Sequence, residues 1–325
     1  MNKQYTTRRY TIEDYALWNQ FVAKAKNATF LFHRDFMEYH SDRFEDYSLM
    51  IFDQKKLCAV IPANFKDQKV YTHQGLTYGG IVFLGNLKFS ESLGIYKSAL
   101  EFLLNNAIQH FVVKVLPRIY STEGVDELDY LLFLTKSTLV RRDLTIAVDR
   151  SNEYKIQSNR MEGVKKGIKN QLQIRADQNF EAFWEELLVP HLKQRFQSTP
   201  THSSKEIQQL ASIFPENIRQ YNVYHQEKLV AGATLFITDT VVHTQYISAN
   251  DDKQQLGSLD FLFHYLIKEA YTDKRFFDLG TSSENAGRAV NKGLLYWKEC
   301  FGGKGYAQDT YKVATENYTL LNEVL

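Results

Sequence analysis

The sequence contains little that could stabilise the chain other than a hydrophobic core. Its 325 residues include 2 Cys and 5 Pro, and the cysteines, Cys58 and Cys300, form no CxxC pair, so a disulfide framework is excluded. Nowhere do 18 apolar residues run together, and the basic N-terminus is not followed by an apolar segment. A membrane span and a secretory signal are therefore not expected. We predict a cytoplasmic protein with two buried free thiols and no membrane insertion.

A dominant charge is missing as well. Lys and Arg number 39 against 38 Asp and Glu, for a formal net charge of +1, so no global field attracts the chain to nucleic acid or to an anionic membrane. The balanced net charge does not exclude a local basic patch. With 44% hydrophobic and 14% aromatic residues, the chain is expected to form large cores. Single cores stop growing near about 250 residues, and the length therefore predicts two domains.

An internal repeat gives these two domains a common origin. Residues Phe52–Ala59 and Tyr224–Ala231 align without gaps at an offset of 172. Further along the offset is 163, and Gly94 and Gly257 each precede a helix with the same apolar spacing. Because the offsets change only at expected loops, duplication is the economical explanation. The first copy has nine extra residues after its three-stranded meander.

Each copy is predicted to contain a strand, two helices, three antiparallel strands, a helix, a strand, a helix and a strand. In the second copy these elements are expected at 171–176, 179–196, 204–213, 219–225, 229–238, 240–249, 257–271, 275–279, 288–299 and 304–312. The helix at 257–271 must be a crossover, which makes the strands on either side of it parallel neighbours. We therefore predict an α/β fold with mixed sheets, divided into domains 1–149 and 150–325.

A basic amphipathic helix is predicted outside the repeat. Arg160, Lys165, Lys166, Lys169 and Arg175 fall between the copies, with Met161, Val164 and Ile168 at helical spacing. Its basic side is either a solvated face or an anion-binding wall at the domain junction. Arg160 and Lys165 are accordingly candidate substrate-binding residues.

Three motifs follow one another near the C-terminus. They are Phe277-Asp-Leu-Gly-Thr-Ser-Ser283, Val290-Asn-Lys-Gly-Leu294 and Tyr296-Trp-Lys-Glu-Cys-Phe-Gly-Gly303. They look like the "FDFG-S", "GL" and "F-K-x-x-F-G" signatures of Fem-type transferases and their FemAB-like acyltransferase relatives. The basic run Asn159–Asn170 is similar to that family's basic helix. The element order resembles the GNAT acyltransferase fold, and the resemblance implies two tandem GNAT-like domains.

The resemblance also implies a binding site for an acyl donor. The segment Gln254-Gln-Leu-Gly-Ser-Leu259 is similar to the GNAT phosphate-binding loop Gln/Arg-x-x-Gly-x-Gly/Ala, with Leu259 in place of the small residue. A bulky side chain there hinders the backbone from approaching a pyrophosphate. The predicted donor is acyl-CoA, and the predicted cofactor-binding residues are Gln254, Gln255, Leu256, Gly257 and Ser258. Fem-type relatives use aminoacyl-tRNA, which stays open as the alternative donor.

Direct attack of an acceptor amine on an activated acyl ester is the reaction that the resemblance implies, with no covalent enzyme intermediate and no metal. The sequence has no GxSxG, HExxH or Walker motif. An amine is mostly protonated at pH 7, so a proton acceptor is needed near the cleft. On strand 240–249, simple alternation puts His243 on one face and Tyr246 on the other. His243 is the candidate base and Tyr246 the candidate acid, with structural packing as the alternative for both.

Two further catalytic candidates lie in the C-terminal motifs. Asp278 is at a strand end before Gly280, where α/β folds place ligand-contacting groups; it either orients the acceptor amine or caps the turn. Lys298 matches the lysine of the family's "F-K-x-x-F-G" signature, and the resemblance implies contact with an anionic intermediate or phosphate. Ser282 and Asn291, which flank this region, are candidate substrate-binding residues.

The extra segment of the first copy is rich in glycine and aromatic residues. It includes His73 and Tyr78, and an aromatic floor of this kind suits a sugar or nucleotide ring. We predict that these two residues help to bind the acceptor.

Three functions follow from these observations. The first is an N-acyltransferase that moves an acyl group from acyl-CoA to an amino sugar, a nucleotide sugar or another small amine. The second is a Fem-type transferase that uses aminoacyl-tRNA and a cell-wall precursor. The third is a catalytically silent binding protein. The oligomeric state is not predicted.

Overall fold

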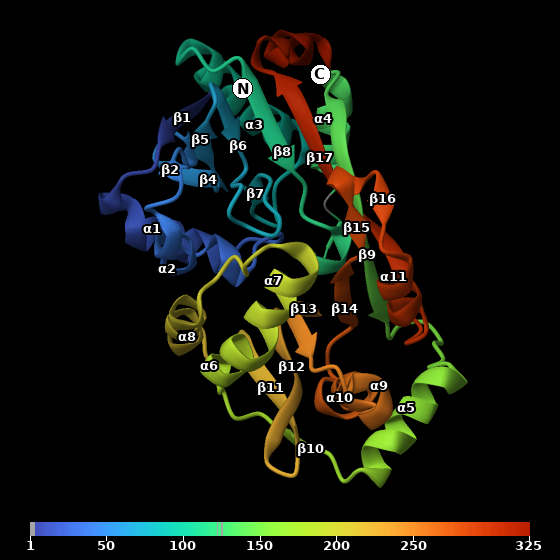
Figure 1. Ribbon diagram of the computed structural model, residues 1–325. Helices are drawn as coiled ribbons and strands as arrows, with labels where there is room; N and C mark the ends of the chain where they lie inside the picture. The colour runs from blue at the N-terminus through green and yellow to red at the C-terminus, as the bar shows by residue number, and fades with distance from the viewer. Residues whose placement is uncertain (1–3, 122, 125) are drawn as a thin grey trace. The chain divides into compact units, whose positions relative to one another are not determined.

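The computed structural model describes residues 4–121, 123–124 and 126–325, drawn in Figure 1. They form two compact units. The first comprises the described residues up to Asp143 together with Ala307–Leu325, and the second comprises Leu144–Tyr306. The chain changes unit within two strands, β9 (Thr138–Asp149) and β17 (Lys304–Ala314).

The last strands of the two copies are exchanged. β17, at the end of the second copy, pairs with β8 (His110–Lys114) of the first unit. β9, at the end of the first copy, pairs with β14 (Phe276–Thr281) of the second. The sequence placed all residues after 149 in the second domain, whereas those after Tyr306 lie in the first unit. The backbone hydrogen bonds of β17 to β8 account for this difference.

The second unit contains a mixed sheet in the order β10-β11-β12-β13-β14-β9. The strands that complete it are β10 (Gln173–Arg175), β11 (Ile218–His225), β12 (Lys228–Ile237) and β13 (Val241–Ala249). β13 and β14 run parallel and are joined by a helical crossover, as predicted. A short hairpin follows β14, formed by β15 (Ser283–Glu284) and β16 (Ala289–Val290).

The helices of the second unit are α5 (Ser158–Lys169), α6 (Phe180–Ala182), α7 (Val189–Phe196), α8 (Ser204–Ile213), α9 (Lys253–Leu256), α10 (Ser258–Tyr265) and α11 (Lys292–Glu299). A π-helical turn, Phe183–Leu188, joins α6 to α7, and another, Leu266–Ala270, extends α10. The start of α8 follows local chemistry, since Ser203 and Glu206 form a capping box there. α5 is the basic helix predicted outside the repeat.

The two faces of this sheet differ in polarity. On one face, Leu235, Val242 and Phe277 pack in a hydrophobic cluster with Phe263 and Leu266 of the α10 segment. The opposite face is covered by the α6–α7 segment, whose Leu187 carbonyl accepts a hydrogen bond of 3.0 Å from Ser248 of β13. This second face carries the polar residues considered below.

A β-bulge in β13 changes which side chains share a face. Leu235 lies opposite Thr244, but Thr234 lies opposite Tyr246, so Gln245 is an extra residue in the ladder. Phe236 lies opposite His243, and residues 234 and 236 of β12 point to the same side. His243 and Tyr246 therefore lie on one face, and the prediction that they lie on opposite faces is wrong, because a bulge shifts the alternation by one residue.

The first unit has the same order of elements as the second, but its antiparallel meander is interrupted. One sheet has the order β1-β3-β4-β7, and the strands β17-β8-β6-β5-β2 form the other ladder. The strands are β1 (Tyr5–Arg9), β2 (Glu45–Asp46), β3 (Leu49–Asp53), β4 (Lys56–Ile61), β5 (Asn64–Lys66), β6 (Lys69–Tyr71) and β7 (Val82–Phe83). Pro62 lies between β4 and β5 and has no N–H to donate, which explains why the counterpart of β12 is split here.

The helices of the first unit are α1 (Tyr15–Val22), α2 (Arg34–Met37), α3 (Phe89–Asn105) and α4 (Glu127–Leu134), followed at the C-terminus by a 3-10 segment, Thr315–Glu323. α3 is the crossover between the parallel strands β6 and β8. Buried residues of α3, β3, β4 and β8 form one apolar cluster. Among the described residues, no helix is both long and apolar enough to cross a membrane.

Candidate active site

A histidine and a carboxylate meet on the polar face of the second unit. His243 and Asp278 are register partners on the parallel strands β13 and β14, and their side chains are joined by a contact of 2.8 Å between His243 Nδ1 and Asp278 Oδ2. Asp278 is buried, while 13% of the His243 side chain is exposed. The structure therefore brings these two predicted residues together, with the imidazole on the accessible side.

Asp278 is held ionised by its neighbours. Burial has the largest effect and by itself would raise its pKa, but the charge of His243 and hydrogen bonds from His243, Thr145 and Gly280 together lower the pKa of Asp278 below its ordinary value. Thr145 Oγ1 donates to Asp278 Oδ1 over 2.6 Å, and the Gly280 N–H donates to the same oxygen over 2.8 Å. Because an ionised carboxylate can only accept, the neutral imidazole of His243 carries its proton on Nδ1. Its Nε2 is then the proton acceptor.

Lys298 lies behind this couple, in the interior. It is 3% exposed, and its Nζ donates to the carbonyl oxygens of Gly280 and Thr281 over 2.9 and 2.7 Å. Burial lowers the pKa of Lys298 to about 8, against the opposing attraction of Asp278. Lys298 therefore fixes the backbone that follows Asp278.

An open stretch of β13 begins beside His243. The ladder between β13 and β14 ends at the His243–Asp278 pair, although β13 continues to Ala249. β14 turns at Gly280, whose φ is +75°, a left-handed conformation suited to glycine. Thr244 Oγ1 and Gln245 Oε1 are buried and have no hydrogen-bond partner among the described residues. Such atoms call for a partner. Thr244 shares the apolar face with Leu235, so a substrate beside His243 could be contacted by Gln245 Oε1 and not by Thr244 Oγ1.

Tyr246 lies on the same face as His243 but contacts a residue that the sequence did not single out. Its hydroxyl is 2.6 Å from His202 Nδ1, and it accepts a hydrogen bond of 3.2 Å from the His202 N–H. Burial raises the pKa of Tyr246, against hydrogen bonds from His202, Gln245 and Thr201. The tyrosine is therefore protonated at neutral pH and able to donate.

The predicted donor-binding loop is largely covered by the chain itself. α5 packs against α9 and α10 (Figure 1), and a Cβ on Gly257 would lie 2.0 Å from the Gly163 carbonyl oxygen of α5. Leu256, Gly257 and Ser258 are buried, so only Gln254 and Gln255 of the five predicted residues are exposed. A pyrophosphate could reach this helix start only if α5 moved.

Residues of the basic helix help to keep it in place. Arg160 Nη1 contacts Asp260 Oδ1 of α10 over 2.9 Å, and Trp297 Nε1 donates to the same oxygen over 3.0 Å. Lys166 Nζ donates to the Gln254 carbonyl over 3.0 Å. Lys165 is exposed and pairs with Glu162 of its own helix. Arg160 therefore has an internal ion-pair partner, while Lys165 belongs to the solvated face.

The two residues predicted to flank the site have structural contacts. Asn291 Oδ1 accepts a hydrogen bond of 3.0 Å from the Leu294 N–H and caps α11. Ser282 is 4% exposed, and its hydroxyl has no hydrogen-bond partner among the described residues. The Ser282 carbonyl accepts from the Asn291 N–H over 2.9 Å. Both residues thus hold the hairpin that follows β14.

His73 and Tyr78 are enclosed within the first unit. His73 is 3% exposed, stacks on His40 with ring centroids 4.9 Å apart, and has a pKa that burial lowers to about 3, with nearby positive charges acting in the same direction. Tyr78 is 2% exposed and its hydroxyl donates to Thr29 Oγ1 over 3.1 Å. The prediction that these rings form an open floor for an acceptor is not supported by their burial.

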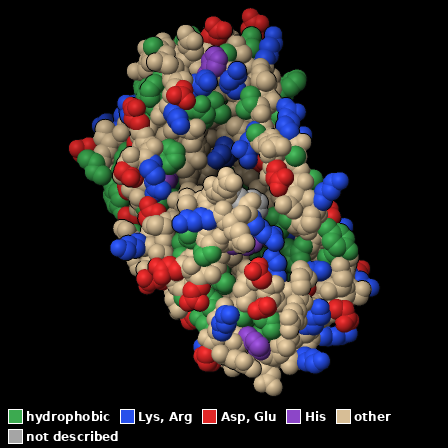
Figure 2. All heavy atoms as spheres, in the orientation of Figure 1, with side chains coloured by type: hydrophobic (Ala, Val, Ile, Leu, Met, Phe, Trp, Pro, Cys, Tyr) green, Lys and Arg blue, Asp and Glu red, His purple; other side chains and the backbone are tan. Residues whose placement is uncertain are grey.

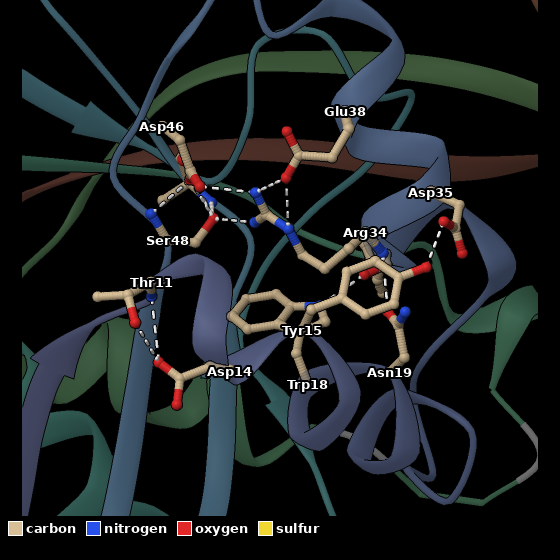
Figure 3. A network of polar contacts seen from close by, with 12 residues as sticks. Thr11, Asp14, Tyr15, Trp18, Asn19, Arg34, Asp35, Glu38, Asp46 and Ser48 are labelled. Carbon is tan, nitrogen blue, oxygen red and sulfur yellow. Dashed lines mark hydrogen bonds and ion pairs between the residues drawn. The ribbon is translucent and has the colours of Figure 1, made fainter.

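A buried arginine organises the N-terminal part of the first unit (Figure 3). Arg34 Nη2 is 2.7 Å from Asp46 Oδ2 and also contacts Glu38, and Nη1 donates to Ser48 Oγ over 3.2 Å. Its guanidinium lies 3.9 Å from the centre of the Tyr10 ring. A charge this deeply buried requires such partners, and Arg34 is fully engaged in holding α2 to the adjoining strands.

The first unit has no counterpart of the His243–Asp278 couple. At the repeat offset of 172, His243 corresponds to Tyr71. Tyr71 of β6 lies opposite Val112 of β8, as His243 lies opposite Asp278. The same pair of strands therefore carries a His–Asp couple in the second unit and a Tyr–Val pair in the first.

The described residues contain no group of three or more His, Cys, Asp or Glu able to hold a metal.

Comparison with known proteins supports the fold assignment. Residues 152–297 match the family described as "Acetyltransferase (GNAT) domain", and no curated protein sequence matches the chain. The structure is similar to FemX, with a TM-score of 0.66, 10% identity and coverage of 98% of this chain and 99% of that one. It is similar to L-PGS from Bacillus licheniformis, with a TM-score of 0.62, 11% identity and coverage of 97% and 96%.

A further similar structure is a tandem GNAT protein from the clavulanic acid biosynthesis pathway, with a TM-score of 0.50, 10% identity and coverage of 96% of this chain and 98% of that one. At these identities the likeness concerns the fold. The chain therefore has the Fem-like tandem-GNAT fold, and the match to the GNAT acetyltransferase family model is confined to residues 152–297.

Proposed function

We propose that the protein is an N-acyltransferase whose chemistry takes place in the second unit. The observation that carries this proposal is the His243–Asp278 couple, located where β13 separates from β14. It joins a partly exposed imidazole to a buried, ionised carboxylate, an arrangement suited to general-base catalysis. The corresponding pair in the first unit, Tyr71 and Val112, has neither group.

In the proposed reaction, the neutral form of the acceptor amine bonds through its nitrogen to the acyl carbon, and His243 Nε2 accepts the proton that this nitrogen loses. The bond from the acyl carbon to the leaving sulfur or oxygen then breaks. The leaving atom takes a proton from Tyr246. Asp278 stabilises the imidazolium formed on His243, while Lys298 keeps Gly280 and Thr281 in position through its two hydrogen bonds. These roles use each of the four predicted catalytic residues.

The proposed donor is an acyl-CoA, in keeping with the GNAT family match. β13 continues past His243 without a ladder to β14, and its half-buried stretch Gln245–Ile247 is the proposed place for the donor's extended arm. The covering of Gly257 by Gly163 disfavours a pyrophosphate at the start of α10. A CoA donor would therefore have to direct its phosphates elsewhere or displace α5.

A second candidate is transfer from aminoacyl-tRNA, and the covered helix start favours it. The acyl group of this donor is an ester on a ribose and needs no pyrophosphate site. α5 presents Lys165 and Lys169 to solvent, where they could contact a nucleic-acid backbone. Figure 2 shows Lys and Arg side chains interspersed with Asp and Glu over the face drawn. Binding of tRNA by a surface of such mixed charge would accordingly be weak and sensitive to salt.

The proposed acceptor is a small primary amine, such as an amino sugar or an amine-bearing nucleotide sugar. The reaction needs a nitrogen that can lose a proton to His243, and this requirement does not depend on the rest of the molecule. Because His73 and Tyr78 are buried, recognition of the acceptor is not assigned to them.

The proposal is tested by measuring acyl transfer from radiolabelled acetyl-CoA and from lysyl-tRNA and alanyl-tRNA to a panel of amines that includes a UDP-linked amino sugar. Wild type is compared with His243→Gln, and Tyr71→Phe is the control at the repeat-related position of the first unit. We expect loss of transfer in His243→Gln only. Equal activity of both variants would contradict the assigned base, and binding of the donors without transfer by wild type would favour the silent binding protein.

A further inference from the structure

A histidine outside the predicted site is bonded to the proposed acid. His202 lies in the loop between α7 and α8, is 3% exposed, and contacts Tyr246 through both its ring and its backbone N–H, at 2.6 and 3.2 Å. Its ring also meets that of Phe236, edge to face, with centroids 6.2 Å apart. Phe236 is the register partner of His243. His202 therefore lies on the same face as the base.

The position of His202 is fixed by a contact that both copies share. Trp184 Nε1 donates to the His202 carbonyl over 2.8 Å, and in the first unit Trp18 Nε1 donates to the Phe32 carbonyl over the same distance. Trp18 and Trp184 are themselves related by the repeat. The same anchored position thus holds a phenylalanine in the copy without the His–Asp couple and a histidine in the copy that has it.

Hydrogen-bond geometry decides what this histidine can do for Tyr246. The backbone N–H of His202 can only donate, so the tyrosine oxygen already accepts one hydrogen bond. If His202 Nδ1 also donates, both lone pairs of that oxygen are occupied. The hydroxyl proton then has to point away from His202.

We propose that His202 is a positioning residue that directs the Tyr246 hydroxyl proton toward the leaving group of the acyl donor. This inference rests on the proposed function. When the bond from the acyl carbon to its sulfur or oxygen breaks, that atom takes the Tyr246 proton, and the two His202 N–H groups stabilise the tyrosine oxygen as it becomes negative. The proton taken from the amine by His243 later returns to Tyr246 through solvent, so the enzyme is restored.

Groups other than His202 also act on the Tyr246 hydroxyl. Hydrogen bonds from Gln245 and Thr201 act on its pKa in the same direction as that from the His202 backbone, and the negative charge of Glu206 on α8 acts in the opposite direction. Trp184 packs edge to face on the tyrosine ring, with centroids 5.0 Å apart. The side chain of His202 is titratable and is in direct hydrogen-bond contact with the Tyr246 hydroxyl.

Two substitutions separate positioning from packing. His202→Phe introduces the residue that occupies the equivalent position of the first unit, so it fits the framework but removes the ring donor. His202→Asn keeps a side-chain N–H near the position of Nδ1. The first readout is the titration of Tyr246 by NMR in protein labelled with 13C at the tyrosine ζ carbon, with Tyr246→Phe used to assign the signal.

The pKa of Tyr246 is expected to rise in His202→Phe, because a donor to the phenolate is lost, and to return toward the wild-type value in His202→Asn. If the tyrosine instead donates to His202, the pKa falls in His202→Phe. A fall, or no change, would overturn the proposal. This readout requires no substrate, so it remains decisive if the proposed function fails.

The second readout compares leaving groups. With the donor identified by the transfer panel, His202→Phe is expected to lose about 10- to 100-fold in kcat, within the range for proton transfer by a positioned side chain. With the p-nitrophenyl ester of the same acyl group, which leaves without a proton, the loss should be below about threefold. Equal losses with both donors would assign His202 to packing. Full activity of His243→Gln would instead refute the proposed function.

Discussion

Replacing Asp278 with asparagine is a small change with a large expected effect. The Asn oxygen can still accept from Thr145 Oγ1 and from the Gly280 N–H, which now bond to Asp278 Oδ1. The Asn amide nitrogen then takes the place of Oδ2 and points its hydrogens at His243 Nδ1. Because an amide N–H cannot accept, His243 must move its proton from Nδ1 to Nε2. The imidazole thereby loses the lone pair that receives the proton of the amine.

The size of the effect follows from the loss of the base. General-base catalysis contributes about 10²- to 10⁴-fold in rate. We expect kcat/KM to fall by about 100- to 1000-fold in Asp278→Asn, which corresponds to about 3–4 kcal/mol of transition-state stabilisation. The two hydrogen bonds to the oxygen are kept, so the free energy of unfolding at pH 7 should change by only about 1–2 kcal/mol.

The assay is steady-state acyl transfer with the donor and amine found in the panel, together with urea unfolding of the same preparations. Asp273→Asn is the matched control, because Asp273 precedes β14 and its side chain is 71% exposed. An Asp278→Asn enzyme within threefold of wild type in kcat/KM would refute the reasoning. A variant that loses activity only in proportion to its unfolded fraction would refute it as well.

Other predictions concern stability and are measured by urea unfolding. The lowered pKa of Asp278 adds stability above its ordinary pKa of about 4, and the difference between wild type and Asp278→Asn should shrink as the pH falls below that value. Lys298→Met should lose about 1–3 kcal/mol at pH 7, because two carbonyl groups lose their donor. Since the folded pKa of Lys298 is about 8 and lies below its unfolded value, wild type should gain stability relative to this variant as the pH rises above 8. Gly257→Ala should cost about 2 kcal/mol or more, because its φ is +69° and a Cβ would lie 2.0 Å from the Gly163 oxygen, whereas Gly293→Ala, with its nearest contact at 3.8 Å, should be neutral or stabilising.

Periodicity and the repeat were sufficient to predict the order of elements. The apolar spacing after Gly257 identified the crossover helix, and a crossover requires the parallel pair that β13 and β14 form. That pairing places His243 beside Asp278. These features could be predicted because they depend on residues close together in the sequence and on a general rule of chain connection.

Features that depend on distant contacts could not be predicted. The bulge at Gln245 cannot be recognised from the alternation of polar and apolar residues along β13. It nevertheless moves Tyr246 to the face of His243. The exchange of last strands brings Thr145 from the first copy to Asp278. A repeat specifies that a strand forms but not which copy it joins. The burial of Gly257 under α5 was missed for the same reason.

The correspondence of His202 with Phe32 could not be predicted from the sequence. Trp18 and Trp184 are matched by the repeat at an offset of 166, and at that offset His202 aligns with Phe36. The pairing of His202 with Phe32 depends on the two tryptophan hydrogen bonds, each to a carbonyl in the segment that follows its helix.

The central claim, that Asp278 holds His243 as a base with its Nε2 lone pair available, is tested most directly by the protonation of the imidazole itself. Long-range proton–nitrogen NMR correlations of 15N-labelled protein at pH 8, with His243→Gln used for assignment, report which nitrogen carries the hydrogen. The geometry predicts hydrogen on Nδ1 in wild type and on Nε2 in Asp278→Asn. Hydrogen on Nε2 in wild type would contradict the account.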